Sequence, residues 1–227
     1  MSTERETKIS NQILYNLFKK YSVADIRILT AIINRLLTKN KALQNENENF
    51  DNVLKIGISL EFFNEYKGKK RLSIKEILEI IDKIGSFGLT ITEKKIHRRI
   101  TIVNEVEYNE KFKSLRITFN ESAIEYLIMI ENKFTLVDLN IIKDLKSKYE
   151  LGLYLLIQMY KNTGIVIKTI DGLKEYFNTG GGTNDLLKYV REAALKLNAA
   201  YDYKINLDYE TVGKRINTVK IKFKKIK

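Results

Sequence analysis

The amino-acid sequence predicts an α+β fold in which one order of elements occurs twice along the chain. Apolar residues recur at helical spacing in several segments and alternate with polar residues in others, and Gly, Ser, Thr and Asn residues stand between these segments. The hydrophobic fraction of 44% is that of a globular protein. We therefore expect two domains, residues 1–133 and 134–227, with the same order of elements and negligible sequence identity to each other.

The first domain is expected to place helices before strands. Its last helix should start after the basic turn "KGKKR", bury Ile74, Ile77, Leu78 and Ile81, and stop at Gly85. The predicted elements are helices at 9–18 and 23–39, an Asn/Glu-rich loop at 40–52, a strand at 53–59, a helix at 59–67 capped by Ser59, a helix at 73–85, strands at 88–95, 98–108 and 113–120, and a connecting helix at 121–133.

The second domain is expected to repeat this order. The predicted elements are helices at 135–145 and 147–162, a strand at 165–168, a helix at 169–178 capped by Thr169, a glycine turn at 180–182, a helix at 183–198, and strands at 201–210 and 215–225. A helix-turn-helix followed by a β-hairpin is the winged-helix plan. The sequence therefore predicts two tandem winged-helix domains joined by the helix at 121–133.

Positive charge is in excess, since 40 Lys and Arg against 28 Asp and Glu give a net charge of +12. Such a protein attracts polyanions, of which nucleic acid is the first candidate and an anionic membrane surface the second. Residues 1–133 carry a net +5 and the shorter segment 134–227 a net +7, so we expect the stronger nucleic-acid contact from the second domain. The apolar segments are too short to span a bilayer and the N-terminus has no apolar signal core, which favours a cytoplasmic protein without membrane contact.

The helix at 183–198 is the candidate DNA-reading helix. Asn184, Lys188 and Arg191 lie at i, i+4 and i+7, on a different stripe from its apolar residues. Asn and Arg form paired hydrogen bonds with adenine and guanine edges, and Lys contacts guanine or phosphate. Thr183 is expected to cap this helix, where free N–H groups suit a phosphate. The alternative interpretation is the solvated face of an amphipathic helix.

The last two predicted strands form a hairpin with a cationic tip. Lys214 and Arg215 lie at the tip, and Lys220 belongs to a lysine-rich face of the last strand. The opposite face carries Val219, Ile221 and Phe223, which suits packing on the domain core. We expect Lys214, Arg215 and Lys220 to contact the DNA backbone.

The first domain offers weaker candidates for DNA contact. Three acidic residues lie on its 73–85 helix and would face phosphates badly, so we expect backbone contacts rather than base reading. A solubilising basic surface is the alternative interpretation. The basic residues concerned are Lys69, Lys70 and Arg71 before the helix, and Arg98 and Arg99 after it.

The chain resembles the replication initiators of iteron-bearing plasmids that replicate by the theta mode. The second domain of that family is similar to "FTLVDLNIIKDLKSKYELGLYLLIQMYKN", "IDGLKEYF" and "LLKYVREAALKLNAAYDYKINLDYETVGKRINTVKIKF", and its first to "SNQILYNLF" and "VADIRILTAIINRL". A departure from the family is the turn "NTGGGTND", which is richer in glycine.

The resemblance implies that monomers bind direct repeats in a replication origin and that dimers bind an inverted repeat and repress their own gene. It implies a dimer interface in the first domain, for which the strands at 98–108 are the candidates, and recruitment of the host initiator and replicative helicase. Base contacts would fall on Asn184, Lys188 and Arg191.

Several other functions are disfavoured by the residues. The chain has no Cys and one His, so neither zinc ligation nor the paired histidines of a rolling-circle nickase is expected. "TGGGTND" lacks the Gly-Lys-Ser/Thr of a phosphate-binding loop. We therefore expect a non-enzymatic protein without cofactor or metal. A tandem winged-helix transcriptional regulator with no replication role is the alternative, and a nucleic-acid enzyme is a third hypothesis without supporting residues.

Overall fold

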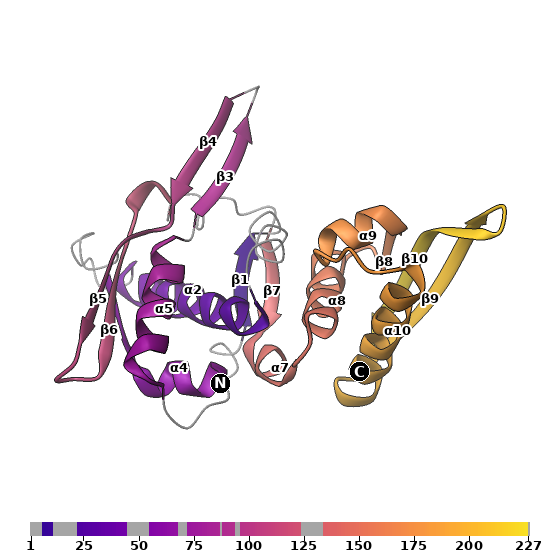
Figure 1. The fold of residues 1–227 in the computed structure, drawn as a ribbon. Helices are drawn as coiled ribbons and strands as arrows, with labels where there is room; N and C mark the ends of the chain where they lie inside the picture. Colours follow the sequence, from indigo (N-terminus) through magenta and orange to yellow (C-terminus); the bar gives the residue numbers. More distant parts are fainter. Residues whose placement is uncertain are drawn as a thin grey trace.

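The chain folds as a mixture of helices and strands, as expected for the α+β class (Figure 1). The computed structural model describes residues 6–10, 22–44, 55–67, 72–86, 88–93, 96–123 and 134–226. The described part of the chain holds no helix that combines the length and the apolar character needed to cross a membrane.

The N-terminal half is built around helix α2 (Val23–Gln44). At its start Ser22 N and Oγ donate to Asp25 Oδ2 at 3.1 and 2.6 Å, and Asp25 N donates to Ser22 Oγ at 3.3 Å. This reciprocal arrangement satisfies N–H groups at the helix start. The helix continues to Gln44, into the segment predicted as a loop. Its buried side chains include Ile26, Leu29, Ile32 and Leu36.

Helix α5 (Ile74–Gly85) begins with a capping box between Ser73 and Glu76 and ends at the predicted Gly85. The prediction of its buried face was wrong in part, because Ile74 and Leu78 are 62% and 53% exposed. The residues that pack inward are Ile77, Ile80 and Ile84. Lys83 Nζ binds the largely buried carboxylate of Asp25 at 3.1 Å, which ties α5 to α2.

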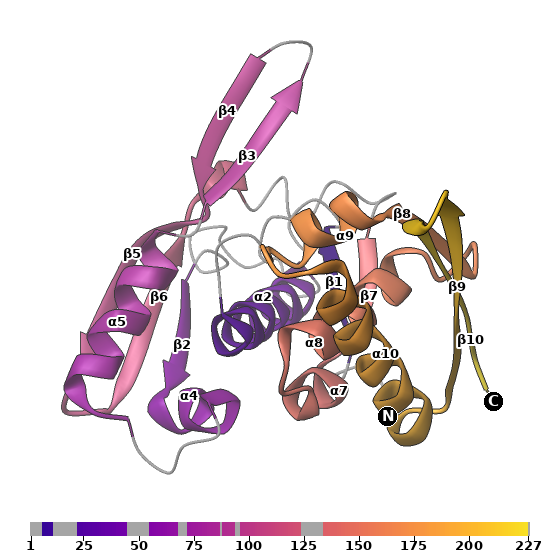
Figure 2. The ribbon, with the colours of Figure 1, turned by 45° about the vertical axis from the view of Figure 1, so that its right-hand side comes forward.

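Two antiparallel sheets complete the N-terminal half. The three-stranded sheet has the order β2-β6-β5, and strands β3 and β4 form a separate hairpin that projects away from the rest of the molecule (Figure 2). The strand predicted at 98–108 is therefore divided, since β4 ends at Thr101 and β5 starts at Val103 around the buried Ile102. The elements are β2 (Lys55–Ser59), α4 (Leu60–Lys67), β3 (Gly88–Glu93), β4 (Ile96–Thr101), β5 (Val103–Asn109) and β6 (Ser114–Phe119).

A two-stranded ribbon brings the start of the chain beside its middle. Strand β1 (Glu6–Ser10) pairs antiparallel with β7 (Phe134–Asp138), and α7 (Leu139–Asp144) follows. The helix predicted at 135–145 is thus a strand followed by a short helix, because Asp138 caps α7 by accepting from Asn140 N at 2.9 Å. Strand β1 also replaces the first residues of the helix predicted at 9–18, of which 11–18 lie outside the described residues. In the connecting segment, 121–123 are helical and 124–133 lie outside the described residues.

The two halves also meet where α2 contacts α7, the helix that precedes α8 (Lys148–Met159). Burial lowers the pKa of Arg27 on α2, while the carboxylates of Glu150 and Asp144 act in the opposite direction. Two carboxylates of the C-terminal half, on α7 and α8, thus act electrostatically on the guanidinium of Arg27.

The C-terminal half repeats the order helix, strand, helix, helix and hairpin. Its three-stranded sheet has the order β8-β10-β9, in which the first strand pairs with the last, as in β2-β6-β5. The hairpin β3–β4 is therefore an insertion relative to the C-terminal half. The elements are β8 (Ile165–Thr169), α9 (Ile170–Tyr176), α10 (Thr183–Ala200), β9 (Tyr203–Val212) and β10 (Arg215–Lys225).

The core of the C-terminal half lies between α8, α9, α10 and one face of the sheet. Thr169 caps α9 as predicted, by accepting from Gly172 N at 3.0 Å. Tyr176 Oη donates to the carbonyl of Gly152 in α8 at 3.1 Å, and both Tyr176 and Phe177 are fully buried. Val219, Ile221 and Phe223 of β10 face this core, which confirms the predicted alternation of that strand.

Candidate nucleic-acid interface

Helix α10 is held against α8 by two side-chain contacts. Tyr189 stacks on Tyr149 with ring centroids 4.9 Å apart, and Lys196 Nζ binds Glu150 Oε2 at 2.8 Å. Burial of Glu150 opposes its ionised form, but hydrogen bonds from Lys196 and from the backbone N–H groups of Lys146 and Ser147 outweigh it and lower the pKa of Glu150. These contacts fix which face of α10 turns toward solvent.

The C-terminal part of α10 is joined to the edge of β9. The amide of Asn198 accepts from Ile205 N at 2.7 Å and donates to the Ile205 carbonyl at 3.2 Å. It thereby satisfies the backbone groups that a neighbouring strand would otherwise pair with. The hairpin and the helix are therefore positioned relative to each other by a side chain of the helix.

The outward face of α10 carries the residues predicted to read bases. Asn184, Lys188 and Arg191 are all exposed, whereas the apolar stripe of the helix is buried. The sequence interpretation did not include Asp185 and Glu192, which are also exposed and flank this stripe on one side. Their negative charges partly offset the positive charges of Lys188 and Arg191. Helical spacing alone could have placed these two acids next to the stripe.

The predicted cap of α10 was wrong by one residue. Gly182 is the N-cap, without a side-chain hydrogen bond, and Thr183 is the first helical residue. Gly182 has no side chain that could accept from the first N–H groups of α10, and the exposed Asp185 lies in the same turn.

The side chain of Arg191 extends toward the hairpin. Its Nη2 donates to the hydroxyl of Tyr209 on β9 at 3.4 Å. Between α10 and the edge of β9 lies an open groove of about 480 Å³, bordered by Arg191, Leu195, Asn198, Leu207 and Tyr209 among others. A guanidinium tethered on one side keeps its other N–H groups available to a ligand in this groove.

The lysine-rich face of β10 is largely neutralised within the sheet. Lys220 forms an ion pair with Glu210, and Lys222 Nζ binds Asp208 Oδ2 at 2.8 Å. The acids alternate along β9 as the lysines do along β10, and each of these lysines binds the acid diagonal to it, since the register places Lys220 opposite Asp208. Lys220 therefore meets a phosphate only by exchanging its partner. At the tip, Lys214 and Arg215 are exposed, and neither forms an ion pair with a described residue.

Removal of the tip charges should weaken binding to every duplex. Lys214→Ala combined with Arg215→Ala is expected to flatten the dependence of log K on log salt by about two phosphate contacts, because each neutralised phosphate releases counterions. The measurement is a binding isotherm on specific and random duplexes across a salt series.

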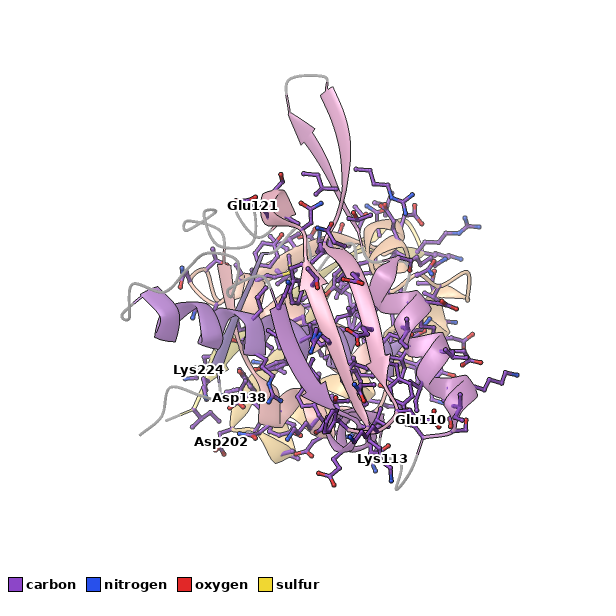
Figure 3. All side chains as sticks on the ribbon, turned by 90° about the vertical axis from the view of Figure 1, so that its left-hand side faces the viewer. Glu110, Lys113, Glu121, Asp138, Asp202 and Lys224 are labelled. Carbon is purple, nitrogen blue, oxygen red and sulfur yellow. The ribbon has the colours of Figure 1, made fainter. Side chains whose placement is uncertain are left out.

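The matched control removes two charges from another hairpin turn. Lys111→Gln with Lys113→Asn changes the β5–β6 turn, which Figure 3 shows with Lys113 and Glu110 at the end of that hairpin. Asn suits position 113, where φ is 45°. The control should leave the slope unchanged. An unchanged slope in the tip variant would show that the tip does not contact phosphates.

The structure describes only some of the DNA-contact residues predicted in the N-terminal half. Lys69, Lys70 and Arg71 lie outside the described residues, and so does the side chain of Arg98. Arg99 is exposed at the base of the projecting β3–β4 hairpin, which is the inserted arm and not the hairpin equivalent to β9–β10. Within the described ranges, no three His, Cys, Asp or Glu side chains are grouped so that they could hold a metal ion.

The chain is similar to known proteins both in sequence family and in fold. The family described as "Initiator Replication protein, WH1" matches residues 6–158. Over 98% of both chains the structure is similar to the Pi initiator protein solved in complex with iteron DNA, with a TM-score of 0.70 and 17% sequence identity. It is also similar to domains 2 and 3 of RctB, with a TM-score of 0.51 and 11% identity over 89% of this chain and 82% of that one. No curated protein sequence matches the chain.

The two structural likenesses show the fold, and the family match covers more than half of the 227 residues. The resemblance to plasmid replication initiators with a winged-helix fold is confirmed. The chain belongs to the family of initiator replication proteins, which bind DNA to initiate its replication.

Proposed function

We propose that this initiator binds double-stranded origin repeats sequence-specifically through α10 and the β9–β10 hairpin. The observation that carries the proposal is the exposed stripe of Asn184, Lys188 and Arg191, of which Arg191 contacts the hairpin that ends in the exposed Lys214 and Arg215. A helix of this kind fits the major groove while the hairpin follows the flanking backbone. The iteron DNA bound by the Pi initiator supports direct repeats as the target.

The proposal includes two tandem winged-helix domains, residues 1–133 and 134–227, joined through the segment 121–133. The sheets β2-β6-β5 and β8-β10-β9 share one topology, which supports this proposal. In each half the chain also runs through a helix, a strand and two more helices before the last two strands of the sheet. The C-terminal domain reads bases with Asn184, Lys188 and Arg191. Backbone contacts come from the N-terminus of α10 at Thr183, from the hairpin, and from the first domain, with Lys69, Lys70, Arg71, Arg98, Arg99, Lys214, Arg215 and Lys220 as the basic residues concerned.

The assembly follows from the same proposal. A homodimer in equilibrium with monomers forms through the strands within 98–108, and the dimer binds an inverted repeat and represses its own gene. The protein acts in the cytoplasm without enzymatic activity or cofactor, and it recruits the host initiator and replicative helicase. The dimer, the repression and the host partners rest on the family resemblance, whereas the cytoplasmic location and the lack of enzymatic activity rest on the composition and motifs of the sequence.

Selection of duplexes from a random pool tests the proposal. We expect one enriched motif that still binds at physiological salt, and direct repeats of it in the origin. A single palindrome without repeats would instead favour a transcriptional regulator. Absence of any motif, with binding that disappears as salt rises, would show that the basic surface binds polyanions without sequence preference.

A further inference from the structure

Leu195 continues the proposed base-reading stripe of α10 by one further turn. It follows Arg191 by four residues and Lys188 by seven, so the three side chains lie on one face of the helix. Its side chain is 63% exposed, although the neighbouring Ala194 and Leu197 are buried in the core. A large apolar side chain in the middle of an otherwise polar outward face suggests a ligand with an apolar group.

The surroundings of Leu195 restrict how DNA can approach it. On one side of the stripe Asp185 and Glu192 are exposed and repel phosphates. On the other side lies the groove toward β9, where Leu195 and Arg191 form part of the same border and the one acidic residue of that border, Asp208, is paired with Lys222. The charges therefore direct a duplex toward the β9 side of the stripe, over Leu195. The cationic tip of the hairpin favours the same side.

The major groove presents one apolar group, the C5-methyl of thymine. An exposed leucine cannot hydrogen-bond to a base edge, but it gains by covering this methyl and excluding water from it. We propose that Leu195 is a specificity-determining residue that contacts the methyl group of a thymine in the target site. This inference rests on the proposed function of α10, and it adds a base preference that the polar residues of the stripe do not provide.

The test removes the methyl group from the DNA and leaves all hydrogen bonds unchanged. In the selected duplex each thymine is replaced in turn by deoxyuridine, and the affinity of the full chain is measured at fixed salt. We expect a loss of about threefold to fivefold at one or two thymines, the size expected for withdrawing one methyl group from an apolar contact.

The variant Leu195→Ala assigns that loss to the side chain. It should fold normally, because the leucine is mostly exposed and alanine is an equally good helix former. We expect it to bind the thymine and deoxyuridine duplexes equally at the sensitive position, while sensitivity at other thymines stays as in the unmodified protein. Leu78→Ala, which removes an exposed leucine from α5, is the matched control and should leave the whole profile unchanged.

The outcomes distinguish failure of the thymine contact from failure of the proposed DNA-binding function of α10. If the protein binds its selected site but the deoxyuridine profile is the same before and after the Leu195→Ala change, the thymine contact alone is overturned. Failure to select any site overturns the proposed function and the contact together.

Discussion

Replacing Arg191 with alanine should weaken binding to the selected duplex by about 1–3 kcal/mol, the value of one base contact with paired hydrogen bonds. Binding to random DNA should change little, because general affinity depends on the summed phosphate contacts. The guanidinium is exposed and tethered to Tyr209 by one N–H, so its remaining donors can meet a base edge. The measurement is the affinity for the specific and for a scrambled duplex at the same salt.

Arg116→Ala is the matched control for this prediction. Arg116 is an exposed arginine of β6 that is likewise held by one side chain, since its Nη1 binds Glu107 Oε2 at 3.2 Å. Its replacement removes the same charge from a strand that the proposal does not place on DNA, and it should leave the specificity ratio unchanged. Equal losses on both duplexes with Arg191→Ala would instead make Arg191 a phosphate contact.

The largest effect on stability is expected from Gly152→Ala in α8. In a helix interior this change normally stabilises by about 1 kcal/mol. Here the new Cβ would lie 2.5 Å from Cε1 of Phe177, a fully buried ring. The adjacent ring of Tyr176 is held by its hydrogen bond to the Gly152 carbonyl at 3.1 Å, so the pair cannot move aside freely. The cost of overpacking should exceed the gain in helix propensity, so the variant should lose about 1–3 kcal/mol in the free energy of unfolding.

Urea unfolding of both variants measures this difference, with Gly85→Ala as the control. Gly85 is also helical, but apart from its own helix and chain neighbours no described residue lies within 4 Å of the position that its Cβ would take. Gly85→Ala should therefore be neutral or stabilise slightly. A Gly152→Ala protein as stable as the unmodified one would show that α9 can shift away from α8 without cost.

Local sequence signals predicted most of the elements that carry the site. The capping residue Thr169, the helix stop at Gly85 and the alternation from Val219 to Phe223 have local causes, namely backbone groups that need partners at helix ends and a strand with one buried face. The exposed positions of Asn184, Lys188 and Arg191 follow equally from helical spacing. Such features depend on residues close in sequence and were predicted for that reason.

Long-range contacts decided the rest. Phe134–Asp138 is a strand because it pairs with Glu6–Ser10, which lies far earlier in the chain and leaves no trace in the local pattern. Ile74 and Leu78 are exposed because the core of α5 is set by what α2 and β5 place against it. The pairing of Lys220 with Glu210 likewise depends on the register of two strands.

The sequence by itself thus determined most of the described helices, the hairpin, the excess of positive charge and the residues that face outward on α10, since each reflects spacing or composition. Only the tertiary structure decided which lysines of the hairpin are paired with acids, how Arg191 leans on Tyr209, and that Leu195 stands exposed beside a groove. The physical reason is that charge pairing and exposure are properties of neighbours in space, which strand register and helix packing bring together.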